Sequence, residues 1–267
     1  MVRKLSSYWG YLMQVSYSRI GCYGNCPYQY KLRYLDRLKT LPDQEPDNAL
    51  YLGTAIHLAF ETGNVEDAIT SYRSNYYMLT DAHYNEEIKL EMLIPKVLAL
   101  LPKAECEVEI STDDFIGFID RLEYLYTDEK GIKHYTIWDY KYCNPKSMDR
   151  YLSSGQLHIY KYYFELTHPN CVVDHLKYVF IPKVNIRQKK TETIQQFRMR
   201  LRETLEVTEP IVTDISYNKD IITDFHSCCQ HLKSVNEFPK NETRLCDWCQ
   251  YKKYCQSNGQ EDWMIIN

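Results

Sequence analysis

The sequence predicts an α/β fold in which a run of strands stands between helical segments. Three strand-like segments follow one another at 104–110, Phe115–Tyr126 and Tyr135–Cys143. The first alternates between apolar and polar residues, and the other two carry long apolar runs. Helical periodicity precedes these strands and returns after residue 148. The 267 residues, 44% of them hydrophobic, are enough for one sizeable domain.

The first part of the chain is expected to be mainly helical. Cys26-Pro27 opens a helix, because proline is favoured in the first helical turn. Residues 42–48 form a polar loop, and Ala49–Gly63 then shows helical spacing of apolar residues and ends in glycine. Residues 65–101 predict further helices, the last of them strongly apolar on one side.

Acidic residues lie within the second and third predicted strands, which a hairpin at Asp128–Gly131 connects. Asp120 lies in the middle of the second strand. Asp139 and Lys141 are two residues apart in the third strand, so their side chains share one face. Two carboxylates and a lysine on neighbouring strands suit a divalent cation and a phosphate, because Mg²⁺ prefers carboxylate and phosphate oxygens.

The second half continues the alternation of helix and strand. Met148–Leu166 is a predicted helix on which Gln156 and Tyr160, four residues apart, share a face. His175–Pro182 is a predicted strand. The mixed-charge segment 188–206 is a predicted helix of the kind that is solvated or follows phosphates.

Composition narrows the class of protein. The net charge of −4 excludes a globally basic surface, so any nucleic-acid contact is expected to be local. The sequence contains no run of 18 apolar residues, so it predicts no membrane span. The N-terminus lacks the apolar core of a signal peptide. We therefore expect a cytoplasmic protein whose ten cysteines are reduced, some of them as ligands of a metal or cluster.

The spacing of three cysteines near the C-terminus is the strongest single signal. Cys246, Cys249 and Cys255 form a C-x₂-C-x₅-C pattern. Three thiolates within ten residues are hard to explain by packing, and a tetrahedral site needs a fourth ligand from elsewhere. Both a structural zinc site and an iron–sulfur cluster satisfy this pattern.

In this order, the motifs resemble the RecB-like branch of the PD-(D/E)XK nucleases. Within that branch the chain is most similar to the iron–sulfur members, which include the CRISPR adaptation nuclease and the nuclease domain of AddB. The similarity extends from about residue 15 to residue 255. The matching motifs are Cys26-Pro27, Gly53–His57, Gly117–Arg121, Asp139–Lys141, Gln156–Tyr160 and the trio Cys246, Cys249 and Cys255.

The resemblance implies a restriction-endonuclease-like core, which is a central mixed sheet flanked by helices. It implies one nuclease domain over residues 1–267, with cluster-binding elements at about 22–40 and 240–258. The implied activity is metal-dependent hydrolysis of DNA phosphodiester bonds by an exonuclease that acts on single strands or DNA ends. DNA is then the substrate, and proteins of recombination, repair or CRISPR adaptation in a bacterial, archaeal or phage-infected cell are the implied partners.

The resemblance also assigns roles to residues. His57, Asp120 and Asp139 are expected to hold Mg²⁺ or Mn²⁺. Lys141 is expected to orient the attacking water or to stabilise the developing charge. Gln156 and Tyr160 are expected to position the strand or to support the lysine.

Three further side chains near these motifs have expected roles. Glu107 or Glu109, on the first strand, is expected to support the metal ligands without binding the metal directly. Arg121 is expected to pair with an acid rather than to contact phosphate.

The resemblance implies a [4Fe–4S] cluster held by Cys26, Cys246, Cys249 and Cys255, with zinc as the alternative. Cys22, in a glycine-rich insert at Gly21–Asn25, is an alternative N-terminal ligand. Two other classes of function stay open: a non-catalytic DNA-binding or adaptor protein on the same fold, and a zinc-stabilised nuclease that acts on RNA.

Overall fold

The computed structural model describes residues 14–260 and 265–266. Contacts divide the chain into two compact units. The terminal unit consists of Met1–Pro42, Ile110–Gly117 and Asn218–Asn267, and the sheet unit consists of Asp43–Glu109 and Phe118–Tyr217. Among the helices of the described ranges, none is long and apolar enough to cross a membrane.

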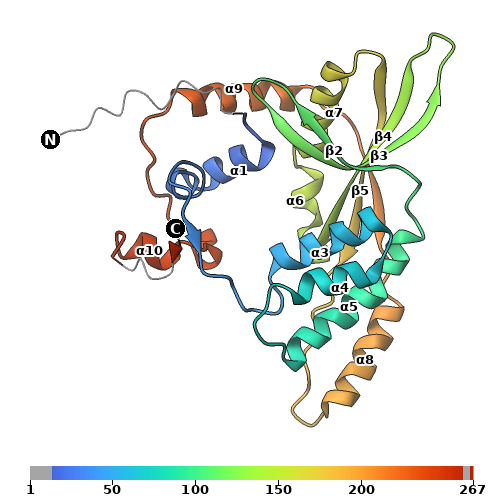
Figure 1. The fold of residues 1–267 in the computed structure, drawn as a ribbon, viewed down its shortest axis with the longest axis vertical. Helices are drawn as coiled ribbons and strands as arrows, with labels where there is room; N and C mark the ends of the chain where they lie inside the picture. The colour runs from blue at the N-terminus through green and yellow to red at the C-terminus, as the bar shows by residue number, and fades with distance from the viewer. Residues whose placement is uncertain (1–13, 261–264, 267) are drawn as a thin grey trace. The chain divides into compact units, whose positions relative to one another are not determined.

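A five-stranded sheet has the order β2-β3-β4-β5-β6 (Figure 1). β3 pairs with β4 in the antiparallel direction, β4 with β5 in the parallel direction, and β5 with β6 in the antiparallel direction. The expectation of a mixed sheet is therefore confirmed. The bounds are β2 Glu105–Ser111, β3 Ile116–Thr127, β4 Lys133–Cys143, β5 Cys171–Pro182 and β6 Ile211–Ile215.

Four helices of the sheet unit pack together against one face of the sheet (Figure 1). Trp138 and Tyr140 of β4 are buried in the apolar core that these helices share with the sheet. The last helix begins six residues later than the segment 188–206 suggests, because Thr193 and Gln196 form a capping box. The helices are α3 Ala49–Thr62, α4 Val65–Arg73, α5 Asp81–Leu98 and α8 Ile194–Glu206.

The connection from β4 to β5 covers the opposite face. Tyr135 of β4 packs edge-to-face on Phe164, with ring centroids 5.5 Å apart. The single helix expected over 148–166 is interrupted at residues 153–155, where Ser-Ser-Gly has a low helix propensity. The connection consists of the 3₁₀ turn Pro145–Ser147, α6 Met148–Leu152 and α7 Gln156–Thr167.

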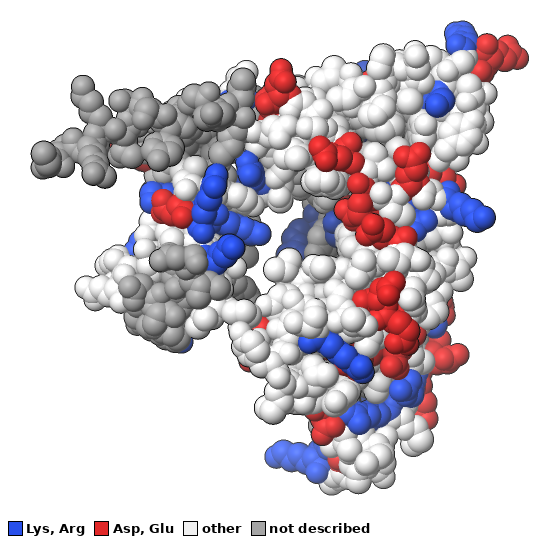
Figure 2. All heavy atoms as spheres, in the orientation of Figure 1, with Lys and Arg blue, Asp and Glu red and all other residues white. Residues whose placement is uncertain are grey.

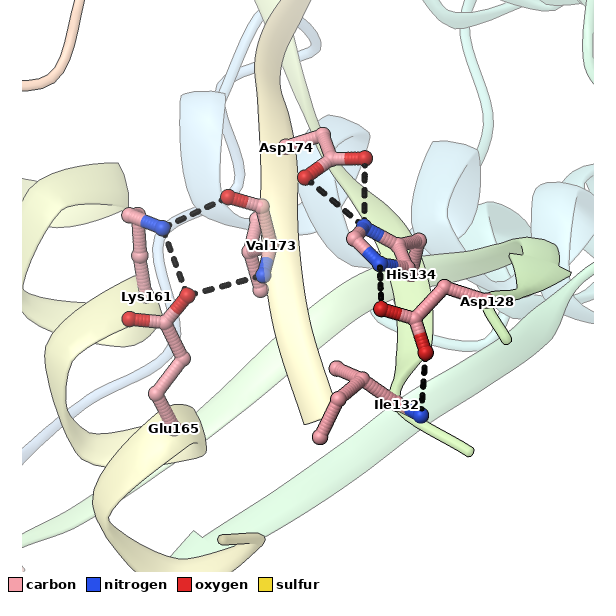
Figure 3. A network of polar contacts seen from close by, with 7 residues as sticks. All are labelled: Asp128, Ile132, His134, Lys161, Glu165, Val173 and Asp174. Atoms are coloured by element: carbon pink, nitrogen blue, oxygen red, sulfur yellow. Dashed lines mark hydrogen bonds and ion pairs between the residues drawn. The ribbon is translucent and has the colours of Figure 1, made fainter. Parts of the chain in front are cut away.

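A three-residue clip attaches α7 to β5 (Figure 3). The Lys161 ammonium donates to a Glu165 carboxylate oxygen at 2.5 Å and to the Val173 carbonyl at 2.6 Å. The same carboxylate oxygen accepts the Val173 backbone N–H at 2.8 Å. The turn end of the β3–β4 hairpin is held to β5 by a separate contact, in which His134 pairs with Asp174 (Figure 3).

Replacing Glu165 with alanine is expected to lower the free energy of unfolding by about 1–3 kcal/mol. Both the Lys161 ammonium and the Val173 N–H lose an acceptor in this variant. Urea denaturation measures the effect, with Glu129→Ala, at an exposed turn position, as the matched control. Equal stability of the two variants would show that the clip contributes nothing.

The first helix in the described part of the terminal unit is one that the sequence pattern did not suggest. α1 spans Tyr17–Asn25 and includes the segment 21–25, which was expected to be a glycine-rich insert. The Ser16 side chain accepts the Arg19 N–H and caps it. As Cys26-Pro27 predicts, α2 (Pro27–Tyr30) follows, and Lys31–Leu35 continues as a π-helical turn.

The two ends of the described chain meet within the terminal unit. The Tyr251 hydroxyl donates to the Leu38 carbonyl at 2.7 Å, and the Asn241 amide donates to the Asn25 carbonyl at 2.9 Å. The C-terminal segment thus packs on the N-terminal helices through direct hydrogen bonds. Its elements are α9 Asp220–Ser234, a 3₁₀ turn Arg244–Trp248, α10 Lys252–Gln256, and β7 Ile265–Ile266, which pairs with β1 Lys39–Thr40.

Candidate active site

His57 reaches the sheet because its helix is fixed at both ends. The Asn48 side chain caps the start of α3, and Gly63 ends it in the left-handed conformation, with φ of 73°. The side chain of Arg121 on β3 then holds the end of α3 by donating to the Phe60 carbonyl at 2.6 Å.

The other contacts of Arg121 extend this clamp. Its guanidinium donates to the Tyr140 hydroxyl and to the Pro102 carbonyl, each at 2.5 Å. The expectation that Arg121 pairs with an acid is therefore wrong. Arg121 binds neutral oxygens from three segments and thereby holds α3 against β3 and β4.

Three ligand atoms converge beside this clamp. Nδ1 of His57 lies 3.6 Å from Oδ1 of Asp120 and 3.8 Å from Oε1 of Glu107. All three atoms lie within 4.8 Å of one another, and they form the one such group of three found in the described ranges. A histidine nitrogen and two carboxylate oxygens are ligands that suit Mg²⁺ or Mn²⁺.

Glu107 joins this group through an unusual backbone conformation. Its φ is 51°, a left-handed value that few residues other than glycine adopt. Non-glycine residues held in such regions concentrate at functional sites. Glu109, which was the alternative to Glu107, is exposed and does not belong to the group.

The neighbouring carboxylates of the site shift the pKa values of Asp120 and His57 upward. Burial, and next the neighbouring Asp139 carboxylate, raise the pKa of Asp120 to about 7. The Asp120 carboxylate also accepts the Tyr140 backbone N–H at 3.1 Å. Burial lowers the pKa of His57, but Glu107, Asp120 and Asp139 outweigh it and raise this pKa above its ordinary value. Crowded carboxylates of this kind favour a cation.

Asp139 and Lys141 share the face of β4 that carries Tyr135, as their spacing predicts. The Lys141 ammonium lies 2.5 Å from Oδ2 of Asp139, whose side chain is only 1% exposed. Burial lowers the pKa of Lys141, but Asp139 and Asp120 raise it more. The structure thus places Asp139 near Asp120 of the candidate metal-binding group, with its carboxylate engaged by the lysine.

Gln156 and Tyr160 lie together on α7. The Gln156 amide donates to the Tyr160 hydroxyl at 3.3 Å. Burial raises the pKa of Tyr160, and the charges of Asp139 and Asp120 contribute to the shift. These two side chains therefore contact each other and border the acids without entering the group of three ligands.

The four cysteines expected to hold a cluster line one cavity in the terminal unit. Its volume is about 560 Å³, and Cys26, Cys246, Cys249 and Cys255 all contribute to its wall. All four thiols are free. Burial raises the pKa of Cys249, and the neighbouring thiols of Cys246, Cys26 and Cys255 raise it further. Cys22 is buried and is not part of this wall.

The four cysteine sulfurs can be compared with the geometry of a tetrahedral zinc site. Zn–S bonds of about 2.3 Å place the sulfurs of a tetrahedral site about 3.8 Å apart. Among the described residues, no three cysteine sulfurs lie within 4.8 Å of one another. The described side chains thus show no assembled cysteine metal site.

The sequence profile of the PD-(D/E)XK nuclease superfamily matches residues 14–256, which include every element of both sites. No curated protein sequence matches the chain. The name of the superfamily describes an acid followed, on the next strand, by an acid-x-lysine motif. Asp120 and the triplet Asp139-Tyr140-Lys141 occupy these positions on β3 and β4. The chain belongs to the PD-(D/E)XK nuclease superfamily.

Proposed function

We propose that this protein is a metal-dependent deoxyribonuclease with a structural [4Fe–4S] cluster, an exonuclease that acts on single-stranded DNA or on DNA ends. The observation that carries the nuclease part is the convergence of His57, Glu107 and Asp120 next to the Asp139–Lys141 pair. A non-catalytic adaptor has no need for a lysine paired with a buried aspartate beside a group of candidate metal ligands. The complete set therefore supports an enzyme.

The residues divide the chemistry between them. His57, Glu107 and Asp120 would hold the cation, and Asp139 would complete its surroundings. When bound, the cation lowers the pKa of a water molecule and offsets negative charge on the phosphate. Lys141 carries a charged ammonium, so it stabilises the negative charge that develops on the phosphate oxygens rather than accepting a proton. Gln156 and Tyr160 support the wall of the site next to the acids.

The surface charge fits a substrate that is bound locally. On the face shown in Figure 2, lysine and arginine side chains are interspersed with acidic ones, without one large basic patch. The net charge of −4 agrees with this distribution. The contacts with the nucleic acid would therefore concentrate around the active site.

The test is incubation of the protein with end-labelled single-stranded DNA, double-stranded DNA and RNA, in Mg²⁺ or Mn²⁺ and in EDTA. We expect cleavage of DNA in the presence of the metal and none in EDTA. The lengths of the labelled products separate exonuclease from endonuclease action. Cleavage of RNA alone, or no cleavage with either metal, would contradict the proposal.

Replacing Glu107 with glutamine is expected to weaken Mn²⁺ binding at least about tenfold, because a neutral amide replaces one charged ligand. Titration calorimetry measures the affinity directly, and the Mn²⁺ concentration needed for half-maximal cleavage provides a second measurement. Glu109→Gln removes the same charge two residues away and is the matched control. Equal weakening of Mn²⁺ binding by both variants would show that Glu107 attracts the cation only by its negative charge and is not a ligand.

The cluster part of the proposal depends on the cavity lined by four free thiols. The C-x₂-C-x₅-C spacing and the resemblance to the iron–sulfur members support a cluster over a single zinc ion. Cys26 is the preferred N-terminal ligand, because it lines the cavity and Cys22 does not. When bound, the cluster would hold α2 and the C-terminal segment together.

A further inference from the structure

Two residues of α6 extend the active site beyond the residues of the superfamily motif. The Lys141 ammonium lies 5.8 Å from the centroid of the Tyr151 ring and 5.9 Å from that of Tyr178. At such distances the face of an aromatic ring attracts a cation, and the attraction grows as water is excluded. The Lys141 side chain is only 17% exposed, so Tyr151 acts on a largely desolvated ammonium.

The position of Tyr151 limits where the ammonium can lie. Tyr151 is half-buried, and its ring also packs near Phe180 of β5. Asp139 holds the ammonium by charge, whereas Tyr151 and Tyr178 restrict it sterically. Tyr178 lies on β5 within the sheet, and Tyr151 reaches the lysine from a short surface helix.

The Arg150 side chain packs on the Tyr151 ring and also donates a hydrogen bond to the Tyr151 hydroxyl. Its guanidinium carbon lies 4.8 Å from the centroid of the Tyr151 ring, and Nη2 donates to the Tyr151 hydroxyl at 2.9 Å. Arg150 is exposed, and it forms no ion pair with an acid of the described ranges. A guanidinium has five N–H donors in a planar arrangement, so most of them stay available to a ligand.

We propose that Arg150 binds a backbone phosphate of the DNA strand next to the phosphate that is cleaved, and that Tyr151 is a positioning residue which holds both Arg150 and Lys141. This inference rests on the proposed nuclease function. Arginine is suited to the contact because its fork matches two phosphate oxygens. One ring then supports a cation for the scissile phosphate and a cation for its neighbour.

The surrounding segment favours this assignment. Lys146 lies in the 3₁₀ turn before α6, is exposed, and likewise has no ion pair with an acid of the described ranges. Arg200 and Arg202 of α8, in contrast, pair with Glu192 and Glu91. Two exposed cations without an acidic partner in the described ranges thus lie on the segment that follows the Asp139–Lys141 strand.

The two residues are expected to affect different kinetic constants. Arg150→Ala should weaken DNA binding about tenfold and reduce the slope of log affinity against log salt by about 0.7–0.9. Tyr151→Leu should lower kcat about 100-fold with a smaller change in KM, because a displaced Lys141 no longer faces the phosphate. Tyr151→Phe should restore most of the kcat that Tyr151→Leu loses, because the ring is kept.

The experiment measures binding of a fluorescein-labelled oligonucleotide in Ca²⁺, which supports binding without turnover, over a series of KCl concentrations. Cleavage in Mn²⁺ is measured on the same variants, and circular dichroism checks that each is folded. Arg202→Ala on α8 removes the same charge from an arginine already paired with Glu91, and is the matched control.

The outcomes separate the inference from the nuclease proposal. If the wild-type protein cleaves DNA but Arg150→Ala binds it with the affinity and salt slope of Arg202→Ala, the inference alone is overturned. Equal kcat values for Tyr151→Leu and Tyr151→Phe would overturn the role of the ring. If the wild-type protein neither binds nor cleaves DNA, the proposed function fails and the inference fails with it.

Discussion

Replacing Lys141 with alanine is expected to reduce the rate of DNA cleavage by about 100- to 1,000-fold. The Lys141 side chain is only 17% exposed, its ammonium pairs with Asp139 at 2.5 Å, and Asp139 and Asp120 favour its charged form by raising its pKa. Its contribution therefore comes when negative charge develops on the phosphate, and removal of the ammonium leaves the bound ground state almost unchanged. The loss should appear in kcat rather than in KM.

Metal content and DNA affinity test whether the loss of cleavage in the Lys141 variant comes from the chemical step alone. Lysine is not a metal ligand in this arrangement, so Mn²⁺ content and DNA affinity in Ca²⁺ are expected to stay within about threefold of the wild-type values. Lys141→Met, which keeps the aliphatic bulk, should behave like Lys141→Ala. Lys177→Ala removes a partly exposed lysine of β5 and is the control. Cleavage by either Lys141 variant at the rate of this control would exclude the assigned role.

The strands that carry the active site could be predicted because their pattern is local. Alternation or a long apolar run marks each of β2 to β5, and a spacing of two places Asp139 and Lys141 on one face whatever the register. Likewise, a spacing of four brought Gln156 and Tyr160 into contact on α7. These relations depend on residues near in sequence, and the structure reproduces them.

The position of His57 depends on contacts between distant segments. It lies near Asp120 because Arg121 binds the carbonyl oxygens of Phe60 and Pro102. No local pattern shows that a buried arginine will bind neutral oxygens rather than an acid. The family resemblance supplied the expectation for His57, and the physical cause became visible only in the structure.

The choice between Glu107 and Glu109 could not be made from sequence. Both occupy equivalent places in an alternating strand pattern, and a regular strand would direct them alike. The left-handed φ of Glu107 breaks this equivalence. An alternating pattern gives no sign of such a conformation, since glycine or asparagine is the residue that usually marks it.

The helix α1 and the strand β6 were missed for different reasons. Gly21 and Gly24 lower the helix propensity of α1, which is nevertheless capped by Ser16 and packs on α9. β6 is only five residues long and lies at the edge of the sheet, where pairing with β5 defines it. Tertiary contacts decided both elements.

Replacing a cluster cysteine with serine is expected to abolish iron binding and to unfold the terminal unit. Cys26 and Cys246 are 220 positions apart in the sequence, and closing so long a loop carries a large entropic cost. Ligation of both residues would offset that cost, in addition to the hydrogen bonds that already join the two segments. Protein purified without oxygen should be brown and contain iron and sulfide.

The variants Cys26→Ser and Cys246→Ser should be colourless and prone to aggregation, whereas Cys22→Ser should keep its iron because Cys22 lies outside the cavity wall. The sheet unit has a core of its own, so any soluble fraction of the first two variants should still bind Mn²⁺. Iron and sulfide analysis and visible absorption measure the cluster content of each variant, and Mn²⁺ titration measures metal binding by the sheet unit.

Loss of iron from Cys22→Ser with retention in Cys26→Ser would reverse the choice of N-terminal ligand. Colourless wild-type protein that contains one zinc ion would exclude the cluster and leave the nuclease site, which lies in the other unit, unaffected.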